Sequence, residues 1–505
     1  MHQRHSPVPL RPGGLLRTAA ALTVLAMVAG TPAPLLAQSQ GLTTEIALDV
    51  ETPQVAAMTE DGSRVVVTTR TRRGRLDTDH QRFGDPTYVA PSLVSAMIIE
   101  TDSGQRSWLH QDPAQVSDFV WSPSGDRLAY LLYDGEAFRL RVHDVAAGQT
   151  REVAPATSKA IASSSFLLWA PDGEDVLLTL RPEGWKERAE EAFYAMTEAP
   201  VIVQDSRNDF LAWDRVRMLA DEQITALVSI DDGAVRELLT DVVPLDVGFS
   251  SDGLRITYAT AQRTKTSYTR RDGTDYGLYS LPLEGGEPVE LVEPSEERVR
   301  VEWNEARDGY AYAEDGAVFV RRVGDEEARA VTEGHRRMEG DTTDVDFSVV
   351  AWSADGGDLL LTSSDAWHIL DLERDVLQTV LTMEEDEEER PQRSVQLWTE
   401  DEGALYFTWS APDRWERGLR RLDLASGEVQ DVVVDSNLYR DWTLTDDART
   451  MVYTMSDGDR PADVWMRRAG AAAPVRLTEL NPQLEDVALA RTELVEYLDV
   501  DGNTL

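Results

Sequence analysis

The stretch Trp121-Ser-Pro-Ser-Gly-Asp-Arg-Leu-Ala-Tyr130 decides the fold, because its pattern recurs along the chain. An aromatic or large apolar anchor comes first, a turn rich in Ser, Pro, Asp and Gly follows, and a short strand starts seven residues after the anchor. The residues seven and nine past the anchor are apolar or aromatic, as a half-buried strand requires. The other clear copies are Trp169-Ala-Pro-Asp-Gly-Glu-Asp-Val-Leu-Leu178, Phe249-Ser-Ser-Asp-Gly-Leu-Arg-Ile-Thr-Tyr258 and Trp352-Ser-Ala-Asp-Gly-Gly-Asp-Leu-Leu-Leu361.

Eight copies of this pattern can be aligned on their anchors. Successive anchors are separated by 63, 48, 80, 54, 49, 46 and 46 residues. The fourth residue after the anchor is Gly in five copies, and Gly readily adopts the positive φ of a tight turn. Arg307, Glu402 and Ala448 occupy this position in the fifth, seventh and eighth copies, which weakens those three assignments. The anchors are Met58, Trp121, Trp169, Phe249, Trp303, Trp352, Trp398 and Leu444.

A second hairpin follows the anchored one, for example at Leu278–Gly286 and Leu419–Gly427. Two hairpins make four strands, and about 50 residues per four-stranded unit is the spacing of a β-propeller blade. The sequence therefore predicts an all-β protein, a β-propeller of about eight four-stranded blades, or of seven if the first or last copy pairs across the ring closure. Because the chain has no cysteine, we expect strand pairing alone to close the ring.

The two longest gaps between anchors hold insertions. In the third blade, five apolar side chains fall at helical spacing, so residues 185–197 are predicted to form a short amphipathic helix. Residues 201–203 and 210–213 are interpreted as strand or docking segments. In the first blade, residues 70–75 hold four Arg side chains, which either form a solvated loop or contact an acidic partner. The apolar residues of the predicted helix are Trp185, Ala189, Ala192, Phe193 and Met196.

The first 37 residues have the pattern of a secretory signal peptide. Arg4, Arg11 and Arg17 form a basic region, residues 18–37 are uncharged, and a core rich in Ala, Leu and Val precedes Ala37. Two prolines interrupt the run, which favours cleavage over an uncleaved membrane anchor. We therefore expect cleavage near residue 37, a periplasmic or secreted protein, and no membrane partner after cleavage.

Composition limits the partners and the chemistry. The 505 residues include 49 basic and 91 acidic side chains, and the formal net charge of −42 argues against nucleic acid as a partner. Only three of the basic residues are lysines, a pattern that fits a salt-adapted surface or a GC-rich genome. The absence of cysteine excludes disulfides, thiolate metal sites and a cysteine nucleophile.

No motif for catalysis, metal or cofactor binding is visible. The sequence contains no Gly-x-Ser-x-Gly, His-Glu-x-x-His, P-loop or Gly-x-Gly-x-x-Gly pattern. The seven histidines are scattered without metal-ligand spacing, and the acidic run 384–389 is typical of a solvated loop. We therefore predict no catalytic residue, no metal ligand and no cofactor in this chain.

The repeats resemble the propeller of the prolyl oligopeptidase family of serine peptidases, most closely its dipeptidyl peptidase IV-like branch. The resemblance includes Val203–Trp213 in the insertion and Leu477–Leu484. It is most specific in Arg491-Thr-Glu-Leu-Val-Glu-Tyr-Leu-Asp-Val-Asp-Gly-Asn-Thr-Leu505, because in that family such a segment leaves the propeller and begins an α/β-hydrolase domain. The resemblance implies a propeller at 42–483 and the start of a truncated hydrolase domain at 484–505, after the signal peptide 1–37.

What the resemblance implies is substrate selection, not catalysis by this chain. The family's Ser, Asp and His lie in the hydrolase domain, so the propeller is expected to gate and select peptide substrates for a missing or separate hydrolase domain. The dipeptidyl peptidase branch holds the substrate's amino terminus with two propeller glutamates, and Glu190 and Glu191 occupy a comparable helix. The alternatives are a solvated helix face for these two residues, and a stand-alone TolB-like periplasmic propeller that binds a protein or peptide.

Overall fold

The computed structural model describes residues 41–77, 91–197, 207–266, 273–336, 344–384, 386, 390–489, 495, 497, 498, 500 and 502. The predicted signal peptide, residues 201–203 and most of the predicted exit hairpin therefore lie outside the described residues. Among the described residues, no helix is both long enough and apolar enough to span a bilayer.

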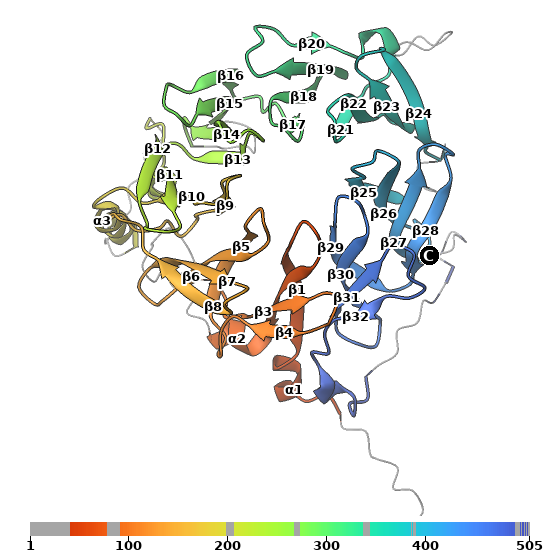
Figure 1. Cartoon of the computed structure of the whole chain (residues 1–505), viewed down its shortest axis with the longest axis horizontal. Coiled ribbons are helices and arrows are strands. Elements are labelled where there is room, and N and C mark those ends of the chain that lie inside the picture. Colours follow the sequence, from red (N-terminus) through yellow and green to blue (C-terminus); the bar gives the residue numbers. More distant parts are fainter. Residues whose placement is uncertain are drawn as a thin grey trace, which may run out of the picture. The chain divides into compact units, whose positions relative to one another are not determined.

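The described strands form eight four-stranded antiparallel sheets, arranged as the blades of a ring (Figure 1). Within each blade the strands follow one another in sequence order, and the first strand lies nearest the central opening. The prediction of a propeller is confirmed, and the blade number is eight.

The first four blades contain the following strands. They are β1 (Glu51–Met58), β2 (Arg64–Thr71), β3 (Ser95–Glu100) and β4 (Arg106–Trp108); β5 (Gln115–Trp121), β6 (Arg127–Tyr133), β7 (Phe138–Asp144) and β8 (Gln149–Val153); β9 (Leu168–Trp169), β10 (Asp175–Leu180), β11 (Ile224–Ser229) and β12 (Val235–Thr240); β13 (Pro244–Phe249), β14 (Arg255–Arg263), β15 (Thr274–Pro282) and β16 (Val289–Ser295).

Blades 5 to 8 contain the remaining sixteen. They are β17 (Val301–Trp303), β18 (Gly309–Glu314), β19 (Ala317–Arg322) and β20 (Arg329–Ala330); β21 (Ser348–Trp352), β22 (Asp358–Thr362), β23 (Ala366–Asp371) and β24 (Val376–Thr382); β25 (Gln392–Trp398), β26 (Ala404–Ser410), β27 (Arg417–Asp423) and β28 (Val429–Asp435); β29 (Leu438–Leu444), β30 (Thr450–Ser456), β31 (Asp463–Arg468) and β32 (Val475–Arg476).

Each predicted anchor is the last residue of the first strand of its blade. The second strand begins six residues after the anchor in all eight blades, one residue earlier than predicted. The fourth residue after the anchor has a positive φ in every copy, including Arg307 (50°), Glu402 (57°) and Ala448 (54°). The three copies that lack Gly are therefore complete blades, and the turn forms without it.

The core lies between blades, not within one central mass. Eight apolar clusters of described residues are found, one at each interface between neighbouring blades. Leu359 and Leu361 pack toward blade 5, whereas Leu360 packs toward blade 7. The expectation of half-buried second strands was wrong, because a blade has a neighbour on both faces and successive side chains are all buried.

Contrary to our expectation, no strand of the described residues pairs across the interface between blades 8 and 1. Blade 1 is built wholly from β1–β4 and blade 8 wholly from β29–β32. The two blades instead share an apolar cluster, and the side chain of Asn481 bonds both backbone groups of Glu51, at 2.8 Å from its N–H and 2.9 Å from its C=O. Arg106 also donates to the carbonyl of Leu477 at 2.7 Å. The cluster comprises Val65, Val67, Met97, Ile99, Val452, Val464, Met466 and Leu477.

The insertion of blade 3 lies between β10 and β11 and contains two helices. The predicted helix is confirmed as α3 (Trp185–Thr197). Residues 210–213 were interpreted as a strand or a docking segment, and the strand alternative is wrong because α4 (Ala212–Asp221) begins within them. Asp214 in its first turn accepts a 2.7 Å hydrogen bond from Thr266. The other short helices are α1 (Thr44–Leu48), α2 (Arg72–Asp77), η1 (Glu333–His335) and η3 (Pro482–Leu484).

Strand alternation defines two faces of the ring. The connections from first to second strands lie on one face, which we call the turn face. The connections from second to third strands and between blades lie on the opposite, insertion face, where α2, α3 and α4 lie. Because β1 starts and β32 ends on the insertion face, the chain enters and leaves the propeller there.

Candidate functional site

The turn face has a cavity of about 950 Å³ at the mouth of the central opening. We call it the axial cavity. It is lined by the ends of first strands and the following turns of blades 5 to 8, together with Glu60 of blade 1. Each blade places its lining residues in the same way. Its first strand ends at the anchor, and the chain then turns back at the mouth of the central opening.

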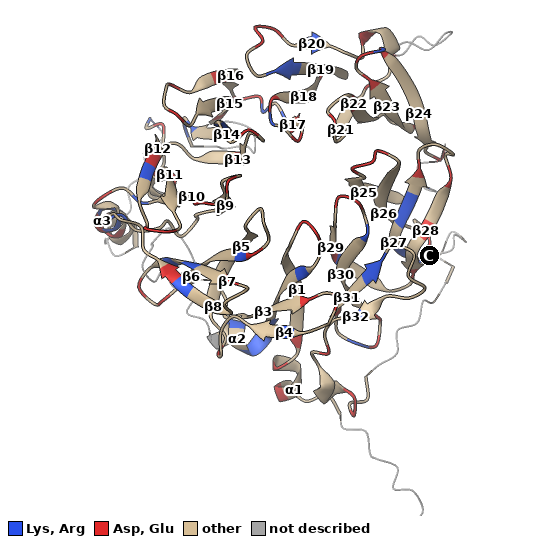
Figure 2. Ribbon diagram, in the orientation of Figure 1, with Lys and Arg blue, Asp and Glu red and all other residues tan. Residues whose placement is uncertain are grey.

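The axial cavity is strongly acidic. Its described lining includes eight carboxylates and no Lys or Arg side chain, and Figure 2 shows acidic residues at the turns around the central opening. Among the described residues, Asp447 alone of the eight forms an ion pair, with Arg449 of its own turn at 3.3 Å. The carboxylates are Glu60, Glu302, Glu305, Asp355, Glu400, Glu402, Asp446 and Asp447.

Three anchor tryptophans, Trp303, Trp352 and Trp398, supply the aromatic surface of the axial cavity. Trp352 donates its indole N–H to the carbonyl of Glu302 in the preceding blade at 2.8 Å, which fixes the ring across a blade interface. The Trp303 ring lies 5.1 Å from Tyr310. Indole faces attract cations, and carboxylates around them strengthen that attraction.

The turns that carry these acids are rigid. Ser353 donates to Asp355 at 2.8 Å and accepts the N–H of Asp358 at 2.9 Å, and Thr445 binds Asp447 at 2.7 Å in the same way. The N–H of Gly357, and then the Ser353 hydroxyl, lower the pKa of Asp355. Asp355 therefore keeps its negative charge at neutral pH.

One carboxylate of the axial cavity differs from the turn aspartates. Burial, and secondarily the negative charge of Asp246, raise the pKa of Glu302. Removal of a carboxylate from water disfavours its charged form, and a cation placed beside it would reverse that effect.

The predicted pair Glu190 and Glu191 does not line the axial cavity. Both residues lie on α3, are exposed, and form no ion pair with the described residues. Figure 1 places α3 at the outer rim of blade 3, away from the central opening. Their role in holding an amino terminus stays a prediction.

A cluster of Ser363, Asp365 and His368 in blade 6 has the residue types of a hydrolytic triad but not its arrangement. The Ser363 hydroxyl donates to Asp365 at 2.6 Å, so its proton points to the carboxylate and not to His368 Nε2, which lies 2.9 Å from the hydroxyl. The second nitrogen of His368 contacts Thr379 at 3.1 Å. Burial lowers the pKa of His368. The three side chains stabilise the hairpin turn between β22 and β23 and do not have the arrangement of a catalytic triad.

Sequence reasoning missed the axial cavity, although its residues lie beside the anchors that it used. A signal was present, because Glu or Asp occurs one or two residues beyond the buried Ser, Thr or Asn in several copies. What the repeat pattern could not show is that five of these turns face one another around the opening.

No protein-family model and no curated protein matches this sequence. Several solved structures are similar to this chain. The acylaminoacyl peptidase of Pyrococcus horikoshii is 12% identical, with 86% of this chain and 53% of that chain covered and a TM-score of 0.44. A structure from a study of two prolyl endopeptidases is also 12% identical, with 91% and 54% covered and a TM-score of 0.44.

The propeller domain of the trilobed protease from Pyrococcus furiosus, which has an open velcro topology, is 11% identical, with 87% of this chain and 99% of that chain covered and a TM-score of 0.43. This chain spans about half the length of the two full peptidases.

Proposed function

We propose that this chain is the substrate-selecting propeller of a secreted prolyl oligopeptidase-like serine peptidase, and that it selects short cationic peptides at its axial cavity. The observation that carries the selection is the cavity itself, about 950 Å³ with three indoles, eight carboxylates and no basic side chain in its described lining. The repeats and the exit segment of the sequence support the peptidase relationship.

The cavity favours a cation for two reasons. Unpaired carboxylates at one mouth create a negative potential that concentrates positive ligands and accelerates their association, an effect that salt screens. The indole rings add attraction for an ammonium or guanidinium group of about 0.5–2 kcal/mol, depending on desolvation. An anionic peptide meets repulsion at the same place.

We assign catalysis to a separate hydrolase domain. The hydrogen bonds of Ser363, Asp365 and His368 are those of a structural turn and not those of an activated serine. The second candidate is a stand-alone peptide-binding propeller, and the closure of the ring by its own side-chain contacts favours it. Stable association of the purified chain with an α/β-hydrolase chain from the same source would distinguish the peptidase module from the stand-alone protein.

Calorimetry with the purified chain tests selection. The probes are N-acetyl-Ala-Arg-Ala-amide and its Gln and Glu analogues, at low and at physiological salt. We expect the Arg peptide to bind most tightly and the Glu peptide not at all. The double variant Glu400→Gln/Asp446→Asn should weaken Arg-peptide binding roughly tenfold, since each exposed charge contact contributes up to about 1 kcal/mol.

The matched control is Glu190→Gln/Glu191→Gln, which removes the same charge from α3. Unchanged binding in this control is expected. Loss of binding in the control, with the axial variant unaffected, would place the site on α3 and show the axial proposal to be wrong. Equal binding of the three peptides would also contradict it.

Catalytic independence has a separate test. The purified chain should neither cleave a dipeptide-p-nitroanilide nor react with a fluorophosphonate probe for activated serines. Labelling by that probe would show that a nucleophile resides in this chain, whatever the outcome of the binding experiment.

A further inference from the structure

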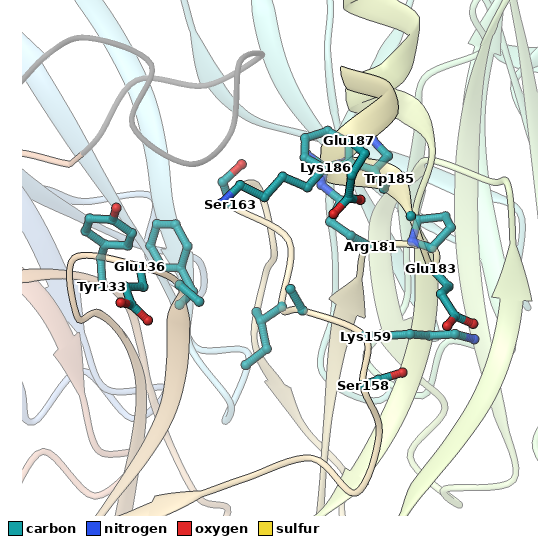
Figure 3. Close-up of a pocket in the computed structure, with 16 residues that line it drawn as sticks. Tyr133, Glu136, Ser158, Lys159, Ser163, Arg181, Glu183, Trp185, Lys186 and Glu187 are labelled. Carbon is teal, nitrogen blue, oxygen red and sulfur yellow. The ribbon is translucent and has the colours of Figure 1, made fainter. Parts of the chain in front are cut away.

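A second cavity, of about 300 Å³, lies between blades 2 and 3 on the insertion face, and we call it the inter-blade cavity (Figure 3). Its walls are the turn after β6, the connection from blade 2 to blade 3, and the segment from β10 into α3. This volume is at the lower end of the range for small-molecule sites, about 300–1,000 Å³. It suits a ligand of one or two amino-acid residues.

The apolar part of the inter-blade cavity is preformed. Phe138, Ile161 and Trp185 are each at most 6% exposed. Ile161 forms single β-bridges to Phe138 and Leu180, so the connecting segment joins the two blades. Trp185 donates to the carbonyl of Leu219 at 2.6 Å, which fixes its ring. A ligand would meet an ordered apolar surface, with little entropy lost by the protein.

Two of the three cations of this cavity already have partners in the fold. Lys159 pairs with Glu237. Arg181, which is 4% exposed, donates to the carbonyls of Ala220 and Glu222 at 2.8 and 3.1 Å, and its guanidinium lies 4.1 Å from the centre of the Trp185 ring.

The remaining charged side chains of the cavity form no ion pair with the described residues. They are Lys186 and the carboxylates of Glu136, Glu183 and Glu187. Figure 3 shows Lys186 extending from α3 toward Ser163, Glu136 on the wall of blade 2, and Glu187 on the α3 side. Unpaired groups of both signs thus surround one apolar floor.

Lysine is nearly absent elsewhere. Three lysines occur in 505 residues, and two of them line this cavity. A compact ammonium on a flexible stem can approach a ligand where the broad, planar guanidinium does not fit. The third, Lys265, pairs with Glu296 at an exposed site and gives a matched comparison.

We propose that the inter-blade cavity binds a small zwitterion with an apolar body, the class of free amino acids and dipeptides with apolar side chains. The ligand's carboxylate would contact Lys186, its ammonium would contact Glu136 or Glu187, and its side chain would pack against Phe138, Ile161 and Trp185. This site is independent of the axial cavity, so it does not rest on the function proposed above.

The low lysine content permits a site-specific test. The full chain labelled with ¹³Cε-lysine should give three lysine signals, which Lys→Met variants assign. On titration with phenylalanine, and separately with Ala-Phe, we expect saturable shifts of the Lys186 signal and none for Lys265. N-acetylphenylalanine lacks the ammonium and phenylalaninamide lacks the carboxylate, so each should bind at least tenfold more weakly.

Variants complete the design. Lys186→Met and Glu136→Gln/Glu187→Gln should each weaken binding at least tenfold, whereas Lys265→Met should not change it. No shift at Lys186, or equal shifts at Lys186 and Lys265, would overturn the proposal. Equal binding of N-acetylphenylalanine would overturn the zwitterion assignment, and unchanged affinity in Lys186→Met would overturn the position of the carboxylate.

Discussion

A hydroxyl or amide side chain next to the anchor organises the turn in seven of the eight blades, whereas blade 3 has Ala170 at this position. In blade 7, Thr399 donates to Asp401 at 2.7 Å and accepts the N–H of Ala404 at 3.1 Å. In blade 5, Asn304 replaces it and accepts the N–H groups of Asp308 and Gly309 at 3.1 Å. These hydrogen bonds together hold the backbone of the turn, so residues other than Gly keep a positive φ there. The copies without Gly looked weaker in the sequence, because Gly was assumed to be needed for the turn.

Replacement of Glu402 by Gly should therefore stabilise the protein. Glu402→Gly removes the strain of a left-handed residue, about 1–2 kcal/mol, and part of that gain is offset by the greater freedom of Gly in the unfolded chain. It also removes the 3.3 Å contact of Glu402 with the N–H of Asp355. We expect a net gain of about 0.5–1 kcal/mol, measured as a higher melting temperature and urea midpoint.

The matched control is Gly356→Ala, at the equivalent position of blade 6, where φ is 71°. A Cβ there would meet its nearest neighbour, Asn304, at 3.5 Å, so there is space and only the backbone is strained. This variant should lose about 1 kcal/mol. A lower stability of Glu402→Gly would show that its side chain contributes more than the strain costs.

Among the elements, α3 shows how much an apolar spacing can predict. Its bounds, Trp185–Thr197, agree with the helical stripe in the sequence, of which Trp185 and Ala189 are buried. The sequence did not show that Arg181 stacks on Trp185, nor that α4 supports it through the carbonyl of Leu219. Helix formation is local, whereas the place where a helix packs depends on residues more than thirty positions away.

The packing of Trp185 holds the insertion against blade 3. Trp185→Ala should remove about 3–5 kcal/mol of packing from the insertion, by analogy with other buried aromatic truncations. Because this loss is local, we expect faster proteolytic cleavage between residues 185 and 221 while the blades stay folded. Limited proteolysis with mass spectrometry measures it. Tyr194→Ala, on the exposed side of α3, should cleave like the parent protein, and equal cleavage of all three proteins would contradict this role.

At the scale of the molecule, the ring closes through side chains. The interface of blades 8 and 1 resembles the other seven in having an apolar cluster, but no connecting chain segment holds it together. The two hydrogen bonds between Asn481 and Glu51, one donated by the Glu51 N–H and one accepted by its C=O, imitate a β-bridge at this point. Close approach also matters, since a Cβ on Gly62 would lie 2.8 Å from Thr445 and Thr450 of blade 8.

Asn481→Ala should weaken this closure. The variant leaves the part-buried N–H and C=O of Glu51 without their partner, which costs about 1–3 kcal/mol. We expect a lower melting temperature and faster hydrogen exchange confined to β1 and β31. The variant Gln483→Ala is the control, because it loses a 3.5 Å contact to Asp49 and a 3.2 Å bond to the Oδ1 of Asn481 but keeps both bonds between Asn481 and Glu51. Uniformly faster exchange in all blades would indicate general destabilisation and contradict a local role in closure.

The sequence by itself determined the propeller, the eight repeats, the strand order within each blade and α3, because turns, alternation and helical spacing depend on residues close together in the chain. Only the tertiary structure decided the side-chain closure of the ring, the burial of both faces of strands such as β22, and the meeting of Glu60 with Glu302 and Glu400 at one mouth. These features join residues separated by hundreds of positions. No local pattern encodes which of the repeated acidic turns face one another until the ring closes.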